Sequence, residues 1–186
     1  MEIRLNLVVL AVLGFTWAHL CATEPVASFE PRSQASRELA ELEDAFAHRP
    51  NDPVLARQLA ETYLELRRPG LAIAALRAGD PALLEHPLVA HRLAQAYEAS
   101  GRVLDALSTA DLALQRCARG LGTSDAPSNT PLPRHLCDQH EHAMLSMHHR
   151  ALSLMVEWGV AVPGRDPRTE VAYDLALRRA RVAMAE

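Results

Sequence analysis

Apolar residues recur at three- and four-residue intervals along most of the chain, which is the periodicity of amphipathic helices. Two segments, 53–72 and 87–106, show it most clearly. Their apolar stripes are Leu55, Leu59, Tyr63 and Leu66 in the first, and Ala90, Leu93, Ala94 and Tyr97 in the second. Ala and Leu dominate the composition and both favour helices, whereas β-branched residues are sparse after the N-terminus. The pattern therefore predicts an all-α fold.

The segments on either side should supply further helices. Upstream, the stretch 36–50 places Leu39, Leu42 and Phe46 on one face, as expected of a helix that packs against the first segment. Downstream, 136–158 and 167–184 form a predicted pair of helices around the turn GVAVPGRDP. The last of these helices carries a line of small residues that would allow close packing, namely Ala172, Ala176, Ala180 and Ala183.

The two clearest segments are copies of one another. Aligned at an offset of 34 residues, 53–72 and 87–106 share seven identities. The identical pairs are Pro53/Pro87, Ala56/Ala90, Leu59/Leu93, Ala60/Ala94, Tyr63/Tyr97, Arg68/Arg102 and Ala72/Ala106. The period, the Leu-Ala-x-x-Tyr motif of the first helix and the alanine twelve positions later resemble the tetratricopeptide repeat family, and Gly101 fills the turn in the second copy.

This resemblance implies a right-handed stack of about seven helices. It covers residues 50–120 well, with repeats near 53–86 and 87–120 in a helical-repeat domain spanning 36–186. The pair within 136–186 departs from the family pattern, because its turn is longer and it lacks a clean Leu-Ala-x-x-Tyr motif. We therefore expect it to be a degenerate third repeat or a capping pair, preceded by a loop at 119–135.

The family resemblance also implies where a partner would bind. In tetratricopeptide stacks the first helix of each pair lines a concave face that holds a peptide or a protein. The partner-binding positions carried over to this chain are Arg57, Glu61, Glu65, His91, Gln95 and Glu98. Their charges are mixed, so they do not form a basic clamp for a carboxylate terminus. Some of them could instead face neighbouring helices.

The N-terminus is not expected to belong to the fold. Residues 5–20 are almost continuously apolar, follow one Arg and precede small residues, which is typical of a secretory signal peptide over 1–22. Lipidation at Cys21 and an uncleaved anchor are the alternatives, and a membrane is an expected partner only in those two cases. A flexible linker would follow at 23–35. Each alternative predicts export, into the periplasm or envelope of a bacterium or beyond it.

Export affects the interpretation of the segment 117–149, which contains two of the three cysteines and five of the nine histidines. In an oxidising compartment the two cysteines that remain, Cys117 and Cys137, are expected to form a disulfide. The histidines offer a competing hypothesis, a copper or zinc site within 135–149. However, no two of these histidines have the three- or four-residue spacing that would let a helix chelate a metal. The wheel of 136–158 predicts a buried face through Cys137, His140, Met144, Met147, Ala151, Leu154, Met155 and Trp158, with His142 and His149 towards solvent.

The remaining composition excludes more than it suggests. A formal net charge of −4 gives no long-range attraction for nucleic acid, which we do not expect as a partner. No phosphate-binding glycine loop, nucleophile elbow or spaced zinc motif is present, so neither an enzyme nor a cofactor is predicted. The sequence thus favours an exported, non-enzymatic interaction or scaffold module. A metal-binding envelope protein is the alternative, and a purely structural subunit of an envelope complex is a third hypothesis.

Overall fold

The structure is a computed structural model that describes residues 34–122 and 137–183. Within these residues it contains seven α-helices, two short 3₁₀ helices and no strand, so the predicted all-α fold is confirmed. The helices are α2 (Gln34–His48), α3 (Pro53–Glu65), α4 (Pro69–Ala78), η1 (Pro81–Glu85), α5 (Pro87–Ala99), α6 (Val103–Gly122), α7 (Gln139–Glu157), η3 (Pro163–Arg165) and α8 (Arg168–Ala183). The predicted signal peptide and nearly all of the predicted linker lie outside the described residues, as does most of the predicted loop. From Leu39 onward the chain forms one compact unit, to which the packing below belongs.

Local sequence signals set where the helices begin. Pro53, Pro69 and Pro87 each occupy the first turn of a helix, where a missing N–H costs nothing. The Asp52 side chain accepts hydrogen bonds from two backbone N–H groups at the start of α3. At the start of α7, Asp138 and Glu141 form a reciprocal capping box.

Three helices end in the same way. After α3, α5 and α7, one residue adopts a left-handed backbone conformation, with φ of 55° at Arg67, 77° at Gly101 and 65° at Gly159. The next residue then donates its N–H to the carbonyl five positions back, at 2.8 Å for Arg68 to Tyr63 and 2.8 Å for Arg102 to Tyr97. Val160 makes the same bond to Met155 at 2.9 Å. This bond is the hallmark of a Schellman motif, in which glycine is normally preferred. Arg67 is therefore the one strained position among the three.

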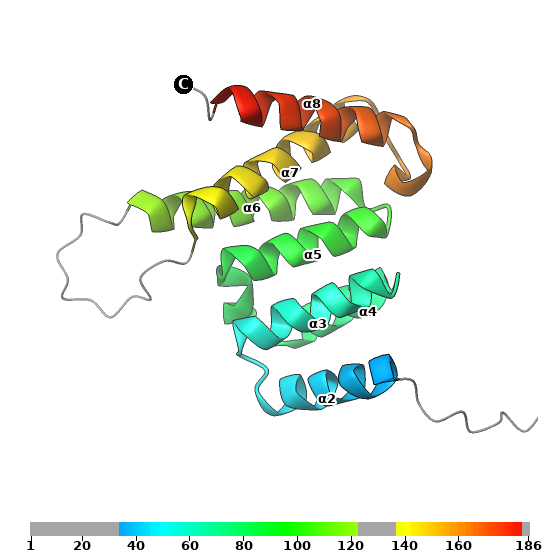
Figure 1. Cartoon of the computed structure of the whole chain (residues 1–186), viewed down its shortest axis with the longest axis vertical. Helices are drawn as coiled ribbons and strands as arrows, with labels where there is room; N and C mark the ends of the chain where they lie inside the picture. Colours follow the sequence, from blue (N-terminus) through cyan, green and yellow to red (C-terminus); the bar gives the residue numbers. More distant parts are fainter. Residues whose placement is uncertain (1–33, 123–136, 184–186) are drawn as a thin grey trace, which may run out of the picture. The chain divides into compact units, whose positions relative to one another are not determined.

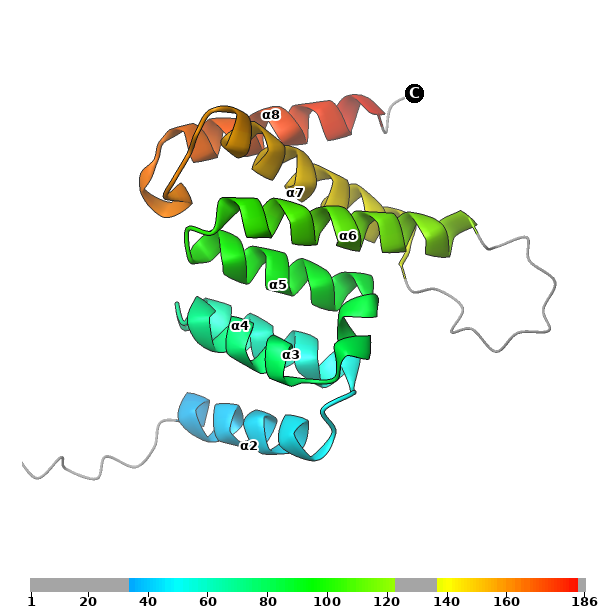
Figure 2. The same cartoon turned by 180° about the vertical axis from the view of Figure 1, so that it is seen from behind.

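Within residues 39–183 the helices stack in chain order. α3 packs on α4, α5 on both of them, α6 on α5, α7 on α6 and α8 on α7. Figures 1 and 2 show this order from two opposite sides. The contacts are made through small residues that are fully or almost fully buried, which lets the helix backbones approach closely. These alanines are Ala56, Ala60, Ala72, Ala90, Ala94, Ala96, Ala106, Ala110, Ala113, Ala151, Ala172 and Ala176.

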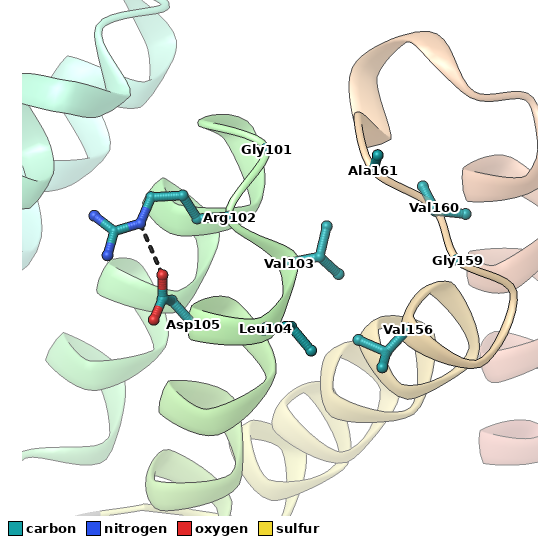
Figure 3. Close-up of a pocket in the computed structure, with 9 residues that line it drawn as sticks. All are labelled: Gly101, Arg102, Val103, Leu104, Asp105, Val156, Gly159, Val160 and Ala161. Carbon is teal, nitrogen blue, oxygen red and sulfur yellow. Dashed lines mark hydrogen bonds and ion pairs between the residues drawn. The ribbon is translucent and has the colours of Figure 1, made fainter.

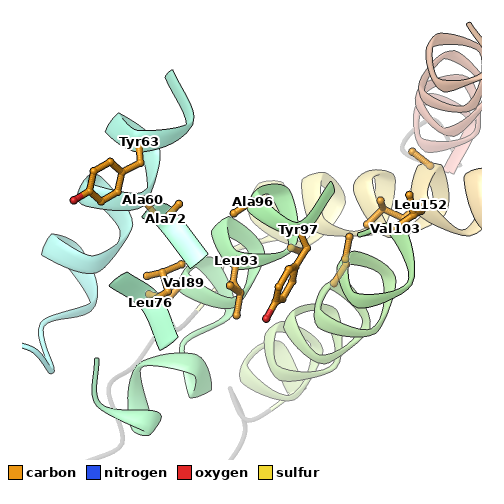
Figure 4. Close-up of a cluster of buried hydrophobic side chains, with 14 of the residues drawn as sticks. Ala60, Tyr63, Ala72, Leu76, Val89, Leu93, Ala96, Tyr97, Val103 and Leu152 are labelled. Carbon is orange, nitrogen blue, oxygen red and sulfur yellow. The ribbon is translucent and has the colours of Figure 1, made fainter. Parts of the chain in front are cut away.

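Larger side chains fill the spaces between these contacts. Leu76, Val89, Leu93, Tyr97 and Leu152 belong to one buried cluster that runs from the N-terminal helices to α7 (Figure 4). The predicted packing helix upstream joins the same cluster, because Phe46 is buried and Leu39 and Leu42 pack against it. α2 is also tied to α3 by the Tyr63 hydroxyl, which donates to a carboxylate oxygen of Glu43 at 2.6 Å.

The end of α6 and the buried face of α7 differ from the sequence prediction. α6 continues to Gly122, beyond the expected start of the loop at 119. On α7 the predicted buried face is partly wrong, because His140 is exposed whereas Leu145 and His148 are buried. The physical reason is that α7 is covered by α6 on one side and α8 on another, so its buried surface is wider than a single stripe.

The Cys117–Cys137 disulfide is present, with the two Cα atoms 5.2 Å apart. Both cysteines are buried in a second small cluster with Ala90, Ala113 and Leu145. The bond thereby joins the last turns of α6 to the residue that precedes the capping box of α7.

None of the helices in residues 34–122 or 137–183 has the length and apolar character needed to cross a membrane.

The strained turn predicts an unusual stabilising substitution. Arg67→Gly should raise the free energy of unfolding by about 0.5–1 kcal/mol, because glycine adopts the left-handed conformation without steric cost. The matched control is Gly159→Ala, which has open space around the added Cβ and should lower stability by about 1 kcal/mol for the opposite reason. Urea titration of both variants tests this. A destabilised Arg67→Gly variant would show that this side chain contributes a contact that outweighs the strain.

The disulfide should stabilise the protein chiefly by closing a loop in the unfolded chain. For a sequence separation of 20 residues, the chain-entropy estimate is roughly 3 kcal/mol. The double variant Cys117→Ser/Cys137→Ser should therefore unfold at correspondingly lower urea concentration. The reduced wild-type protein is the control, and equal stability of the oxidised and reduced forms would contradict the expected effect.

Candidate partner-binding face and buried polar cluster

A row of polar side chains links α3 to α5. One Arg92 guanidinium nitrogen lies 2.7 Å from a Glu61 carboxylate oxygen, and the other donates to the Gln95 side-chain oxygen at 2.9 Å. We call Glu61, Arg92 and Gln95 the α3–α5 polar row. The Arg92 and Glu61 side chains are 25% and 44% exposed, so the ion pair is partly open to water and to a partner. A partner could therefore exchange these bonds for its own.

Two further predicted residues lie on α3, four positions to either side of Glu61. Arg57 is half-buried and Glu65 is exposed. Because residues four apart on a helix share a face, Arg57, Glu61 and Glu65 extend along one side of α3. The structure therefore joins Glu61 and Gln95 through Arg92 and places Arg57 and Glu65 in line with Glu61 along α3.

The other two predicted residues, His91 and Glu98, lie in a different environment. The Glu98 carboxylate accepts a hydrogen bond from the Tyr173 hydroxyl of α8, which lies 2.9 and 2.8 Å from its two oxygens. His148 Nε2 of α7 lies 3.0 Å from one of the same oxygens. The His91 and His148 rings meet edge to face with their centroids 4.9 Å apart. We call His91, Glu98, His148 and Tyr173 the buried polar cluster.

The prediction that His91 contacts a partner needs correction. His91 is only 3% exposed and the Glu98 side chain only 14% exposed, since α7 and α8 supply neighbours that cover them. In this structure these two residues contact α7 and α8 and hold them against α5. Of the predicted residues, Arg57, Glu61, Glu65 and Gln95 are accessible or partly accessible, and the half-buried Arg92 lies among them.

Burial dominates the electrostatics of the cluster. Desolvation, followed by the nearby His148 and Arg92, lowers the pKa of His91 to about 3, so its ring is neutral at physiological pH. Desolvation and the Glu98 carboxylate raise the pKa of Tyr173, which keeps its hydroxyl as a donor. Two buried ring nitrogens, His91 Nε2 and His148 Nδ1, have no hydrogen-bond partner. A neutral imidazole can leave an unprotonated nitrogen unpaired at moderate cost, but an imidazolium has a proton on both nitrogens.

A third histidine, His86, precedes α5. Desolvation and the charge of Arg57 lower its pKa, while Glu141 of α7 acts in the opposite direction. Its Nδ1 is also buried without a partner. Arg57 therefore lies close enough to affect this residue as well as facing the α3–α5 polar row.

The histidine-rich segment does not assemble a metal site in the part of the chain that the structure describes. His140 is exposed, His149 lies 3.7 Å from Asp111, and the thiol that could have joined His140 is oxidised in the disulfide. No group of three or more potential ligands is close enough to hold an ion among residues 34–122 and 137–183. His135, which belonged to the predicted set, lies outside these residues.

An open pocket of about 480 Å³ lies elsewhere, between the turn that joins α5 to α6 and the residues after α7. Its walls are mainly apolar, with Val103, Leu104, Val156 and Val160, and its one ion pair joins Arg102 to Asp105 (Figure 3). Apart from Arg102 and Asp105, its lining residues carry apolar side chains or none.

Three functional residues were missed by the sequence analysis. Arg92 follows His91 and carries no pattern of its own, although an arginine within the predicted face could have been considered as its organising cation. His148 was grouped with possible metal ligands, and nothing marked its neighbour in the structure, Tyr173. Only the contact between α5 and α7–α8, which spans at least 50 residues of sequence, brings these side chains to Glu98.

Comparisons of this chain with protein-family models, with curated proteins and with solved structures give no match.

The buried imidazole predicts that acid destabilises the protein. His91 has a pKa of about 3 when folded and an ordinary value near 6.5 when unfolded. The contribution of the neutral His91 ring to the free energy of unfolding is therefore complete above pH 6.5 and is lost as the pH falls towards 3. Between pH 7 and pH 5 the free energy of unfolding should drop by about 2 kcal/mol. Urea titrations at these two values test the drop, and a stability that does not change with pH would contradict the burial of His91.

Proposed function

We propose that this chain is an exported, non-enzymatic interaction module of the tetratricopeptide type, which binds a peptide or a partner protein. The face that we assign to the partner runs along α3 and α5 and consists of Arg57, Glu61, Glu65, Arg92 and Gln95.

The observation that carries the proposal is the equivalence of residues 34 positions apart. Leu59 and Leu93 are both buried, as are Tyr63 and Tyr97, and Ala72 and Ala106 have no exposed surface. Arg67 and Gly101 adopt the same left-handed backbone conformation. In both copies the next residue donates its N–H to the carbonyl five positions back. Such equivalence supports two copies of one helix pair, and stacked helix pairs characteristically present their extended surfaces to other proteins.

The chemistry of the assigned face also supports binding rather than catalysis. Arg92 already satisfies Glu61 and Gln95, and both of these partners are partly accessible. A peptide carboxylate or amide could replace either bond with one of similar geometry, because a guanidinium has five N–H donors. No nucleophile with an adjacent base lies on this face among the described residues.

Export is part of this proposal, and the N-terminal segment and the cysteines support it. The apolar run at 5–20 has the length of a signal segment. The Cys117–Cys137 disulfide supports an oxidising compartment, since cytosolic thiols are usually kept reduced.

Photo-crosslinking in the native cells tests the assigned face. A benzophenone amino acid at Glu65 or Gln95 should give an adduct of defined mass, whereas the same probe at Arg77 of α4 or Gln115 of α6 should not. The control positions are exposed, so the probe does not disturb the core. The variant Arg57→Glu should abolish the adduct at Gln95, because it reverses the charge beside the α3–α5 polar row, and Arg77→Glu should leave it intact.

Equal adducts from both pairs of positions, or adducts only at Arg77 and Gln115, would contradict the assigned face. An adduct at Gln95 that survives Arg57→Glu would show that Arg57 does not contribute to partner binding. Circular dichroism of each variant confirms that the helices remain folded.

A further inference from the structure

The buried polar cluster is the place where α7 and α8 meet α5. Glu98 of α5 accepts from Tyr173 of α8 and lies against His148 of α7, so one carboxylate joins three helices. Among the described side chains of α8, the buried ones are the small Ala172 and Ala176, while Val171 and Leu175 are 51% and 43% exposed.

The charged groups around the cluster make added protons unfavourable. On α5, Arg92 is already a cation near His91, and its charge is offset by Glu61 of α3. On α7, His148 is the group that faces His91, and on α8 it is the neutral Tyr173 hydroxyl that faces Glu98. Glu98 can therefore balance one imidazolium, at His148. A second positive charge at His91, with ring centroids 4.9 Å apart, has no carboxylate of its own.

The contacts between α7 and α6 do not involve the buried polar cluster. His149 lies 3.7 Å from Asp111 of α6. The Cys117–Cys137 disulfide joins the same helices near the start of α7 and does not depend on pH in the acid range. Acid thus weakens the contact of α7 and α8 with α5 while the link to α6 is preserved.

We propose that the buried polar cluster is an acid-sensitive contact, and that protonation of His91 separates α7 and α8 from α5 while α7 stays tethered to α6. The separated form exposes His91, Glu98 and the facing side of α7. Helices α3 and α4, which contribute no residue to the cluster, remain folded. The proposal does not require that the partner-binding face be correct.

Hydrogen–deuterium exchange of the full chain at pH 7 and pH 5, followed by mass spectrometry, tests the proposal. Exchange times are scaled for the intrinsic pH dependence of amide exchange. Peptides from the second half of α7 and from α8 should lose protection by at least about tenfold at pH 5, because one additional proton is taken up on opening. Peptides from α3 and α4 should lose clearly less protection, because the separation of α7 and α8 does not expose their amides.

Variants identify the responsible group. His91→Gln removes the titrating ring, and His91→Phe does so while keeping an aromatic side chain, so at least one of them should fold and lose the acid response. The matched controls are His140→Gln, an exposed histidine on α7, and His86→Gln, a half-buried histidine that precedes α5 and has a buried Nδ1. Both controls should respond to acid as the wild type does.

Four outcomes would overturn the proposal. Loss of protection in α3 and α4 in parallel with α8 would indicate ordinary acid unfolding. A response that persists in both His91 variants, or that disappears in His86→Gln, would assign the effect to another group. Unchanged protection of α7 and α8 at pH 5 in the wild type would show that the contact is not acid-sensitive.

Discussion

The close approach of neighbouring helices through alanine is the constraint on which the rest of this fold depends. Ala56, Ala60, Ala72, Ala94 and Ala106 have no exposed surface, so even one added methylene at these positions would separate two helices. Alanine buries little apolar area by itself. Most of the hydrophobic free energy that stabilises the fold must therefore come from the larger side chains that the close approach brings together, such as Leu76, Leu93 and Tyr97. No helix pair satisfies this requirement alone, and each one relies on its neighbours in the stack.

The C-terminal pair meets the same constraint with different residues. α7 and α8 keep the close contacts through Ala151, Ala172 and Ala176. Where they meet α5, however, two histidines, a glutamate and a tyrosine replace apolar packing. A buried polar contact of this kind specifies one arrangement, because any displacement leaves its groups unpaired, but its stability depends on protonation. The disulfide compensates by fixing the beginning of α7 to α6.

Much of the fold could be predicted from the sequence, because apolar periodicity and helix-start residues are local signals. The helices around 53–65 and 87–99 and the disulfide were predicted, and two members of the predicted alanine line of α8, Ala172 and Ala176, are buried. The sequence did not reveal that Arg67 adopts the backbone conformation of Gly101, because nothing in the residue type signals it. It also misplaced the buried face of α7, since a helix covered on two sides does not show a single stripe.

The candidate site was predictable only in part. Carrying over positions from the family resemblance placed Arg57, Glu61, Glu65 and Gln95 on accessible or partly accessible parts of α3 and α5. It failed for His91, because whether a residue of α5 is open or covered depends on α7 and α8, which are distant in sequence. His148 and Tyr173 were missed for the same reason, whereas Arg92 was missed because no sequence pattern marked it.

The central claim is that α5, α7 and α8 are joined through the buried polar cluster. Nuclear magnetic resonance of the histidine side chains in the full chain at pH 7 tests this claim most directly. The account predicts a neutral His91 ring with nuclear Overhauser contacts to the His148 ring, together with a Tyr173 hydroxyl proton that exchanges slowly. A His91 ring that carries a second proton at this pH, without a contact to His148, would contradict it.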